Sequence, residues 1–93
     1  MSVIYKYELE PKQVQDLMMP VGAKILHVAN QFEKICLWAL VDRLAEHKPR
    51  RFVIFLTGEQ DFEAEKSNYL GTVLMQNGVL VLHVFEPLPP QVN

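Results

Sequence analysis

The sequence has 93 residues, of which 49% are hydrophobic and 22% are charged, and its formal net charge is −2. A chain of this length forms one domain around one core and has little room for a deep cofactor cavity. The slightly acidic balance argues against a surface that binds nucleic acid through its phosphates. We therefore expect one small domain, residues 1–93, whose ligand site is shallow or lies between copies of the chain.

The cysteine content and the hydropathy pattern favour a cytoplasmic protein. Cys36 is the single cysteine, so no internal disulfide can form, and its place in the apolar run 35–41 predicts a buried thiol. The first residues lack the charged, apolar and cleavage regions of a signal peptide. No apolar stretch approaches the ~18 residues of a membrane span, so we expect no membrane partner.

The first two predicted elements are a strand and a short helix. Residues 3–10 alternate between apolar and polar side chains, which predicts a half-buried strand that ends at Pro11. Residues 12–19 are the one segment with apolar side chains at helical spacing. Pro20 ends this predicted helix, because the residue before a proline avoids the helical region, and a loop with one helical turn is the alternative.

Three strands are predicted in the middle of the chain, at residues 23–30, 34–42 and 51–58, with a polar connection between the last two. Within the second strand, residues 35–41 are apolar at every position, which predicts burial of both faces or cover by a helix or a second subunit. A helix over residues 32–45 is the alternative, because Leu, Ala and Glu are good helix formers.

The dipeptide Asn77-Gly78 between two apolar runs predicts a final β-hairpin, because a type I′ turn needs positive φ at both central residues. A two-residue loop places Thr72 opposite His83 and Leu70 opposite Phe85. Both faces of this hairpin are then largely apolar, which indicates cover on both sides or an interface between copies. We therefore expect a homo-oligomer.

These elements together predict a mainly β fold. About six strands with turns at hairpin spacing are typical of a small antiparallel sandwich, roll or open barrel. At most one short helix is expected, at residues 12–19.

Motifs for catalysis or metal binding are absent from the sequence. His27, His47 and His83 do not have the spacing of zinc ligands, and there is no nucleophile elbow, P-loop or dinucleotide fingerprint. The acidic run from Glu59 to Glu65 is interpreted as a solvated loop. We expect no enzymatic activity, no metal and no cofactor.

Lys48, Arg50 and Arg51 form the main cationic cluster, with His83 as a further candidate ligand contact. The cluster is either a solubilising strand entry or a patch for phosphate or an acidic protein surface. Arginine can hold phosphate with two hydrogen bonds, but adjacent strand residues point to opposite faces, so one arginine at most would face a given ligand. His83 is interpreted as a histidine bonded to a neighbour such as Thr72, or as a ligand contact.

Several stretches of the sequence resemble a family of small uncharacterised proteins encoded by phages and prophages. They are spread along the chain in the family's order, at residues 4–7, 19–26, 36–42, 57–59, 69–72 and 82–86. The resemblance implies a phage context and favours an accessory or host-interaction protein over a metabolic enzyme. It supplies no catalytic residues.

The sequence leaves two functional hypotheses. The first is a non-enzymatic binding or interaction protein, a phage or prophage accessory factor that contacts a host protein. The alternative is a protein that binds or sequesters a small anionic nucleotide, with Arg50 or Arg51 and His83 in a site between subunits.

Overall fold

The computed structural model describes residues 1–60 and 64–88, and these residues form a mainly β, antiparallel fold, as the sequence predicts. Seven strands lie within the described ranges, where the sequence predicts about six. They are β1 (Ser2–Leu9), β2 (Val14–Pro20), β3 (Lys24–Gln31), β4 (Lys34–Asp42), β5 (His47–Leu56), β6 (Ser67–Met75) and β7 (Leu80–Pro87). A short 3-10 segment, η1 (Ala64–Lys66), precedes β6, and the segment η2 (Gln76–Gly78), whose residues have positive φ, forms the turn that follows it.

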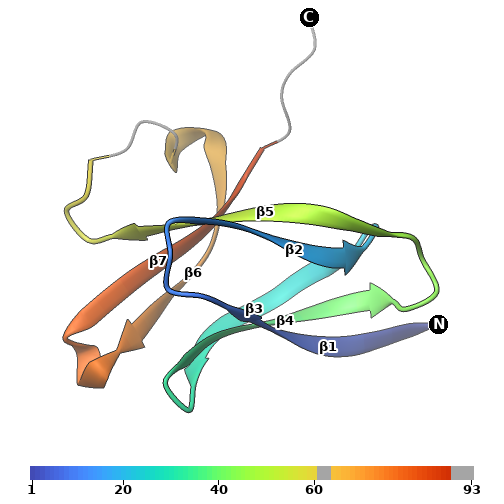
Figure 1. The fold of residues 1–93 in the computed structure, drawn as a ribbon, viewed down its shortest axis with the longest axis horizontal. Helices are drawn as coiled ribbons and strands as arrows, with labels where there is room; N and C mark the ends of the chain where they lie inside the picture. Colours follow the sequence, from blue (N-terminus) through green and yellow to red (C-terminus); the bar gives the residue numbers. More distant parts are fainter. Residues whose placement is uncertain (61–63, 89–93) are drawn as a thin grey trace, which may run out of the picture.

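The strands form two open sheets (Figure 1). The β1 sheet has the order β1-β4-β3, and the β2 sheet has the order β2-β5-β7-β6. One side of each sheet contributes to a common hydrophobic core, so the fold is an open antiparallel sandwich. The core draws on all the strands and includes Leu9, Met19, Val28, Ile35, Leu37, Val41, Phe52, Val73, Leu82 and Val84.

The pairing of β1 with β4 shows why the apolar run at residues 35–41 is a strand. The odd residues of both strands lie opposite one another, from Val3 with Val41 to Leu9 with Ile35, and they face the core. Cys36 lies on the other side of β4 and is buried, as predicted. The predicted burial of both sides is confirmed only in part, because on this second side Trp38 is half-buried and Leu40 is exposed.

Residues 12–19 are not a helix, and the prediction of one is wrong. Residues 14–19 belong to β2, which pairs with β5 and turns Gln15, Leu17 and Met19 inward. Two helical turns would have left most of their backbone groups without partners, whereas β5 supplies a ladder. The predicted polar connection is also wrong in part, because residues 47–50 are the part of β5 that pairs with the second half of β2.

The final hairpin confirms the predicted turn and most of the predicted register. Asn77 and Gly78 have φ of 56° and 87°, and the Val79 amide donates to the Gln76 carbonyl, as in a type I′ turn. Thr72 lies opposite His83 as predicted.

The prediction that Leu70 opposes Phe85 is wrong. A β-bulge between Tyr69 and Gly71 shifts the register, so Tyr69 lies opposite Phe85. A two-residue turn fixes the pairing only until such an irregularity occurs, and the bulge occurs where β6 passes the other sheet, at Gly71.

The turns of the β3–β4 and β6–β7 hairpins are joined by hydrogen bonds that involve Glu33 and Asn30. The Glu33 side chain accepts from the Gln76 amide (3.0 Å) and from Asn30 Nδ2 (2.7 Å), and Asn30 Nδ2 also donates to the Leu74 carbonyl (3.0 Å). These bonds hold an edge of the β1 sheet against an edge of the β2 sheet. Figure 1 shows the two turns at the same end of the molecule.

The same two edges approach closely at Gly71, which gives a first prediction. A Cβ atom built on Gly71 would lie 3.3 Å from Val28 Cβ, an atom that cannot rotate away because it is bonded to the β3 backbone. We expect Gly71→Ala to lower the free energy of unfolding by about 1–3 kcal/mol through overpacking, measured by urea denaturation. In a double-mutant cycle, Gly71→Ala should cost less in a Val28→Ala background. Equal costs in both backgrounds would contradict the steric explanation.

Candidate functional site

Arg50 points to the core side of the β2 sheet and is held by a carboxylate. Its Nε and Nη2 donate to the two oxygens of Glu86, each at 2.7 Å, and Nη1 donates to the Ala23 carbonyl in front of β3. The two side chains are 24% and 19% exposed, so this pair is largely withdrawn from water. Arg50 therefore joins the two sheets at one end of the sandwich, and its donors that face Glu86 and Ala23 are already used.

Arg51 points to the opposite side of β5, as the strand pattern predicts for adjacent residues. Its Nε donates to Asp16 on β2 at 3.0 Å in an exposed ion pair. The hydrogen bond that Arg51 donates to Asp16, together with the negative charge of Asp16, raises the pKa of the Arg51 guanidinium above its ordinary value. Lys48 is exposed and lies opposite Met19. Each arginine of the predicted anion patch thus has its own carboxylate partner.

His83 lies on the outer side of the β2 sheet, opposite Phe55 on β5 and Thr72 on β6. Its Nε2 is 2.7 Å from Thr57 Oγ1, and its Nδ1 is 2.9 Å from Thr72 Oγ1. The Tyr69 hydroxyl bonds in turn to Thr72 Oγ1. The predicted bond to Thr72 is confirmed. Because hydroxyl groups can donate or accept, either neutral tautomer of His83 is satisfied.

The four residues predicted as a ligand site do not converge. Arg50 faces the core side of the β2 sheet while Arg51 and His83 face the other side, and β5 separates Arg51 from the Phe55–His83 pair by four positions. His27, the other histidine considered, lies on β3 beside Trp38. Within the described residues, no group of three or more His, Cys, Asp or Glu could hold a metal ion. Asp61 and Glu63 of the acidic run lie outside the described residues.

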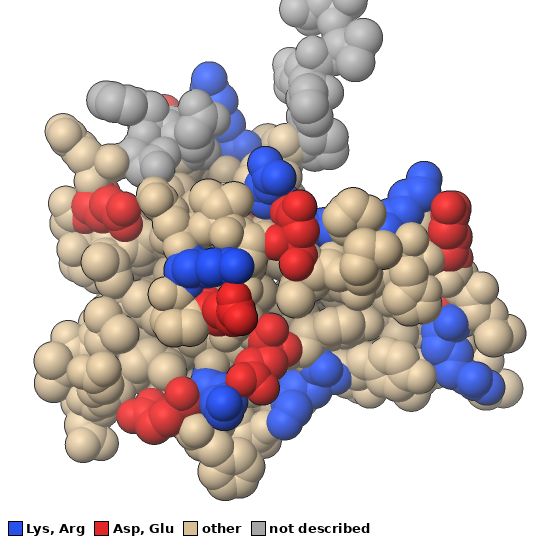
Figure 2. Space-filling model, viewed as in Figure 1, with Lys and Arg blue, Asp and Glu red and all other residues tan. Residues whose placement is uncertain are grey.

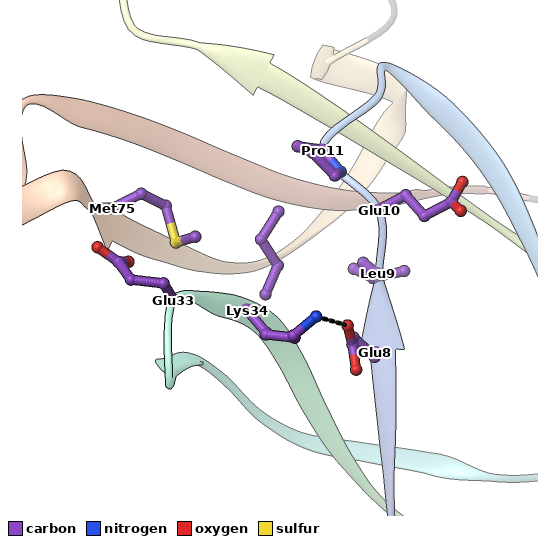
Figure 3. A pocket seen from close by; sticks show the side chains of 8 residues that line it. Glu8, Leu9, Glu10, Pro11, Glu33, Lys34 and Met75 are labelled. Carbon is purple, nitrogen blue, oxygen red and sulfur yellow. Dashed lines mark ion pairs between the residues drawn. The ribbon is translucent and has the colours of Figure 1, made fainter.

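A shallow pocket of about 300 Å³ opens beside the end of β1, with Leu9, Ile35 and Met75 on its apolar walls (Figure 3). Its charged rim is already engaged. Lys34 Nζ lies 3.2 Å from Glu8 Oε1, and the Glu33 carboxylate accepts the hydrogen bonds that join the two hairpin turns. The Glu10 carboxylate is paired as well, because it lies 3.1 Å from Lys12 Nζ. Each of the charged side chains that line this pocket therefore already has a partner.

The outer face of the β2 sheet is the most distinctive surface of the molecule. We use the name outer face for the side chains that point away from the core on its four strands. They are Val14, Asp16 and Met18 on β2, Arg51, Val53 and Phe55 on β5, Tyr69, Thr72 and Leu74 on β6, and Val81, His83 and Phe85 on β7. Asp16 and Arg51, the charged members of this set, neutralise one another at one side.

Aromatic rings form the centre of the outer face. Phe85 makes edge contacts with Phe55 and with Tyr69, at centroid distances of 5.3 and 5.4 Å. Phe55 is 6% exposed, whereas Tyr69 and Leu74 are each 58% exposed. The aromatic cluster and the bonds of His83 fix these side chains in one arrangement, so the face is both apolar and ordered.

On the face of the molecule that Figure 2 shows, the charged side chains do not form a large field of one sign. In the view of Figure 2, lysine and arginine side chains alternate with aspartate and glutamate over the visible surface. In the part of the chain that the structure describes, no helix is long and apolar enough to cross a membrane.

Sequence reasoning found part of the outer face. The predicted strand at residues 51–58 contains Val53 and Phe55, and the turn at Asn77-Gly78 placed Thr72 opposite His83. It missed Tyr69 and Thr57 as partners in the chain of hydrogen bonds. The first depends on the bulge in β6, and the second on the pairing of β5 with β7, which no local pattern indicates.

Comparisons with known proteins place the chain in a family without assigning a function. Neither the curated proteins nor the solved structures gave a significant match. The family model described as a domain of unknown function, DUF7352, matches residues 1–93. The chain therefore belongs to the DUF7352 family.

Proposed function

We propose that the protein is a non-enzymatic interaction protein that binds another protein through the outer face. The observation that carries the proposal is the aromatic cluster of Tyr69, Phe85 and Phe55 on the outer face, with Tyr69 58% exposed. Protein interfaces are enriched in aromatic residues and depleted of charge at their centres, and contiguous exposed apolar surface marks such sites. The outer face has this composition.

The fitting partner is a protein surface with apolar side chains and little charge. Leu74, Tyr69 and Met18 protrude from the outer face and would be buried on binding. The Tyr69 hydroxyl and the His83–Thr57 pair lie among them and can exchange a hydrogen bond with a polar group of the partner. Tyrosine is favoured in such positions because its large ring loses little conformational entropy.

We further propose that the partner is a host protein and that the chain acts as a phage or prophage accessory factor in the cytoplasm. The support is the resemblance of the stretches at residues 4–7, 19–26, 36–42, 57–59, 69–72 and 82–86 to small phage and prophage proteins. Membership in DUF7352 is compatible with this origin.

The anionic-nucleotide alternative has weaker support. It requires Arg50 or Arg51 to exchange a carboxylate partner for a phosphate, and His83 to approach from another part of the sheet. The pair between Arg50 and Glu86 is bidentate and mostly buried, so its exchange is the more costly of the two.

The proposal is tested with two matched variants. Leu74→Arg places a charge on the outer face, and Leu44→Arg makes the same change at an exposed leucine of the β4–β5 turn. Each immobilised protein is incubated with an extract of the host cells, and the retained proteins are quantified by mass spectrometry. We expect a protein that the wild type and Leu44→Arg retain equally and that Leu74→Arg retains about tenfold less, a loss of about 1.4 kcal/mol.

Circular dichroism melting of both variants shows whether each is folded. Retention of the same proteins in the same amounts by a folded Leu74→Arg variant would refute binding through the outer face. A thermal-shift measurement with nucleotides tests the alternative. Stabilisation that Arg51→Ala removes would favour anion binding over the proposed protein interaction.

A further inference from the structure

The exposed edges of the two sheets differ in how they are protected from pairing with another strand. An edge strand presents unpaired N–H and C=O groups, and proteins commonly protect such edges with proline, bulges or a covering element. The edge of β6 lies against β3, where Asn30 Nδ2 donates to the Leu74 carbonyl and Gly71 lies close to Val28. β3 itself contains a bulge between Ile25 and His27.

Prolines protect the edges of β2 and of the first part of β5. The Ile54 amide donates to Gln13 and the Val21 amide donates to Glu46, so even residues of β5 and odd residues of β2 face one another. Pro20 and Pro49 therefore stand where the backbone faces outward. Each removes the N–H group that another strand would need.

β1 is the least protected of these edges, because Lys6 and Glu8 are charged but no proline, bulge or covering strand within the described ranges blocks it. It pairs with β4 over an unbroken register from Ser2 to Leu9, contains no proline and no bulge, and has no strand on its other side among the described residues. An open edge of this length is a template for a further antiparallel strand.

The charged side chains of β1 are complementary to those of a second, antiparallel copy of β1, which makes β1 itself the fitting partner for this edge. If two copies related by a twofold axis join their β1 sheets with both cores on the same side, residues of the same parity must lie opposite one another. A register centred on Lys6 would place two like charges together. The register centred on Tyr7 places each Lys6, which donates to Gln31 in its own chain, opposite the partner's Glu8. The Glu8 carboxylate is exposed and lies 3.2 Å from Lys34 through one oxygen, so its other oxygen can accept from Lys6 of the second copy.

The same register joins apolar residues on the core side of the strand. Tyr7 lies opposite the partner's Tyr7, and Tyr5 lies opposite the partner's Leu9. Tyr5 is substantially exposed in the single chain and Tyr7 is half-buried, so both would lose exposed apolar surface on pairing. The exposed side of the strand carries the charged pairs and the core side carries the rings, as expected for a sheet that continues across an interface.

We infer that the protein forms a homodimer in which two β1 strands pair antiparallel about Tyr7, so that the two β1 sheets become one continuous sheet. This interface uses a sheet edge and leaves the outer face of the β2 sheet free. The inference is therefore independent of the proposed binding of a partner protein.

The test is an exchange of charges. Lys6→Glu and Glu8→Lys each place like charges opposite one another in the dimer, so we expect each variant to dissociate at least about tenfold more readily than the wild type. The double variant Lys6→Glu/Glu8→Lys restores both pairs with reversed signs. An equimolar mixture of the two single variants also restores them and should form a heterodimer.

Sedimentation equilibrium between about 1 and 300 µM covers the range in which such an edge contact associates. Lys24→Glu, a charge change on β3 away from the β1 edge, should dimerise as the wild type does, and so should Leu74→Arg. A wild type that stays monomeric throughout the range would overturn the inference. The inference would also be overturned if the charge changes did not alter the dissociation constant of the dimer. It would be overturned as well if an equimolar mixture of the two single variants formed no heterodimer.

Discussion

Replacement of Phe52 by alanine is expected to lower the free energy of unfolding by about 3–5 kcal/mol, the usual cost of removing a buried phenylalanine ring. Phe52 has no exposed surface and lies in the middle of the core, opposite Gln15 on β2. The loss combines the transfer free energy of the ring with the cavity that it leaves. A loss of this size is a large part of the stability of a small domain.

Urea denaturation followed by circular dichroism measures the change, and Phe32→Ala is the matched control. Phe32 is 88% exposed at the β3–β4 turn, so its truncation should change the free energy of unfolding by less than about 0.5 kcal/mol. Similar losses for both variants would mean that the core does not lie around Phe52.

The second large effect is expected at Arg50. Arg50→Met leaves the Glu86 carboxylate largely buried without its bidentate partner and the Ala23 carbonyl without its donor. We expect the free energy of unfolding to fall by about 2–4 kcal/mol, because an unpaired buried charge costs far more than the intact pair contributes. The same urea titration measures this change.

Two comparisons separate the charge effect from lost packing. Arg50→Met/Glu86→Leu replaces both partners by apolar groups and should recover most of the loss. Arg51→Met removes a neighbouring arginine whose ion pair is exposed, so its effect on the free energy of unfolding should be much smaller than that of Arg50→Met. If Arg50→Met were as mild as Arg51→Met, the Arg50–Glu86 pair would not join the two sheets in the way described.

Local patterns in the sequence predicted the strands with regular alternation or continuous burial. The spans of β1 and β4 and the turn at Asn77-Gly78 follow directly from side-chain periodicity and from the φ preferences of asparagine and glycine. β2 was missed because Val14, Leu17 and Met18 fit a helical stripe as well as they fit a strand. Only the pairing with β5, distant in the sequence, decides between the two.

The candidate site was less predictable than the fold. The cluster of Lys48, Arg50 and Arg51 is conspicuous in the sequence, but the carboxylates that engage the arginines come from β2 and β7. The outer face is assembled from four strands, and its composition becomes apparent only when their order is known. The sequence shows how many charged residues lie together, but the ion pairs that neutralise Arg50 and Arg51 join residues far apart in the sequence.

The contact that Glu33 makes between the two hairpin turns also bears on the order of folding. The β3–β4 and β6–β7 hairpins each close a short loop, so each can form early and the Glu33 bonds can then join them. β1 and β2 instead pair with strands that lie far along the chain, β4 and β5. During synthesis from the N-terminus they emerge from the ribosome first but wait longest for their partners. The first strands made can therefore enter the sheets only after the chain has been synthesised through β4 and β5.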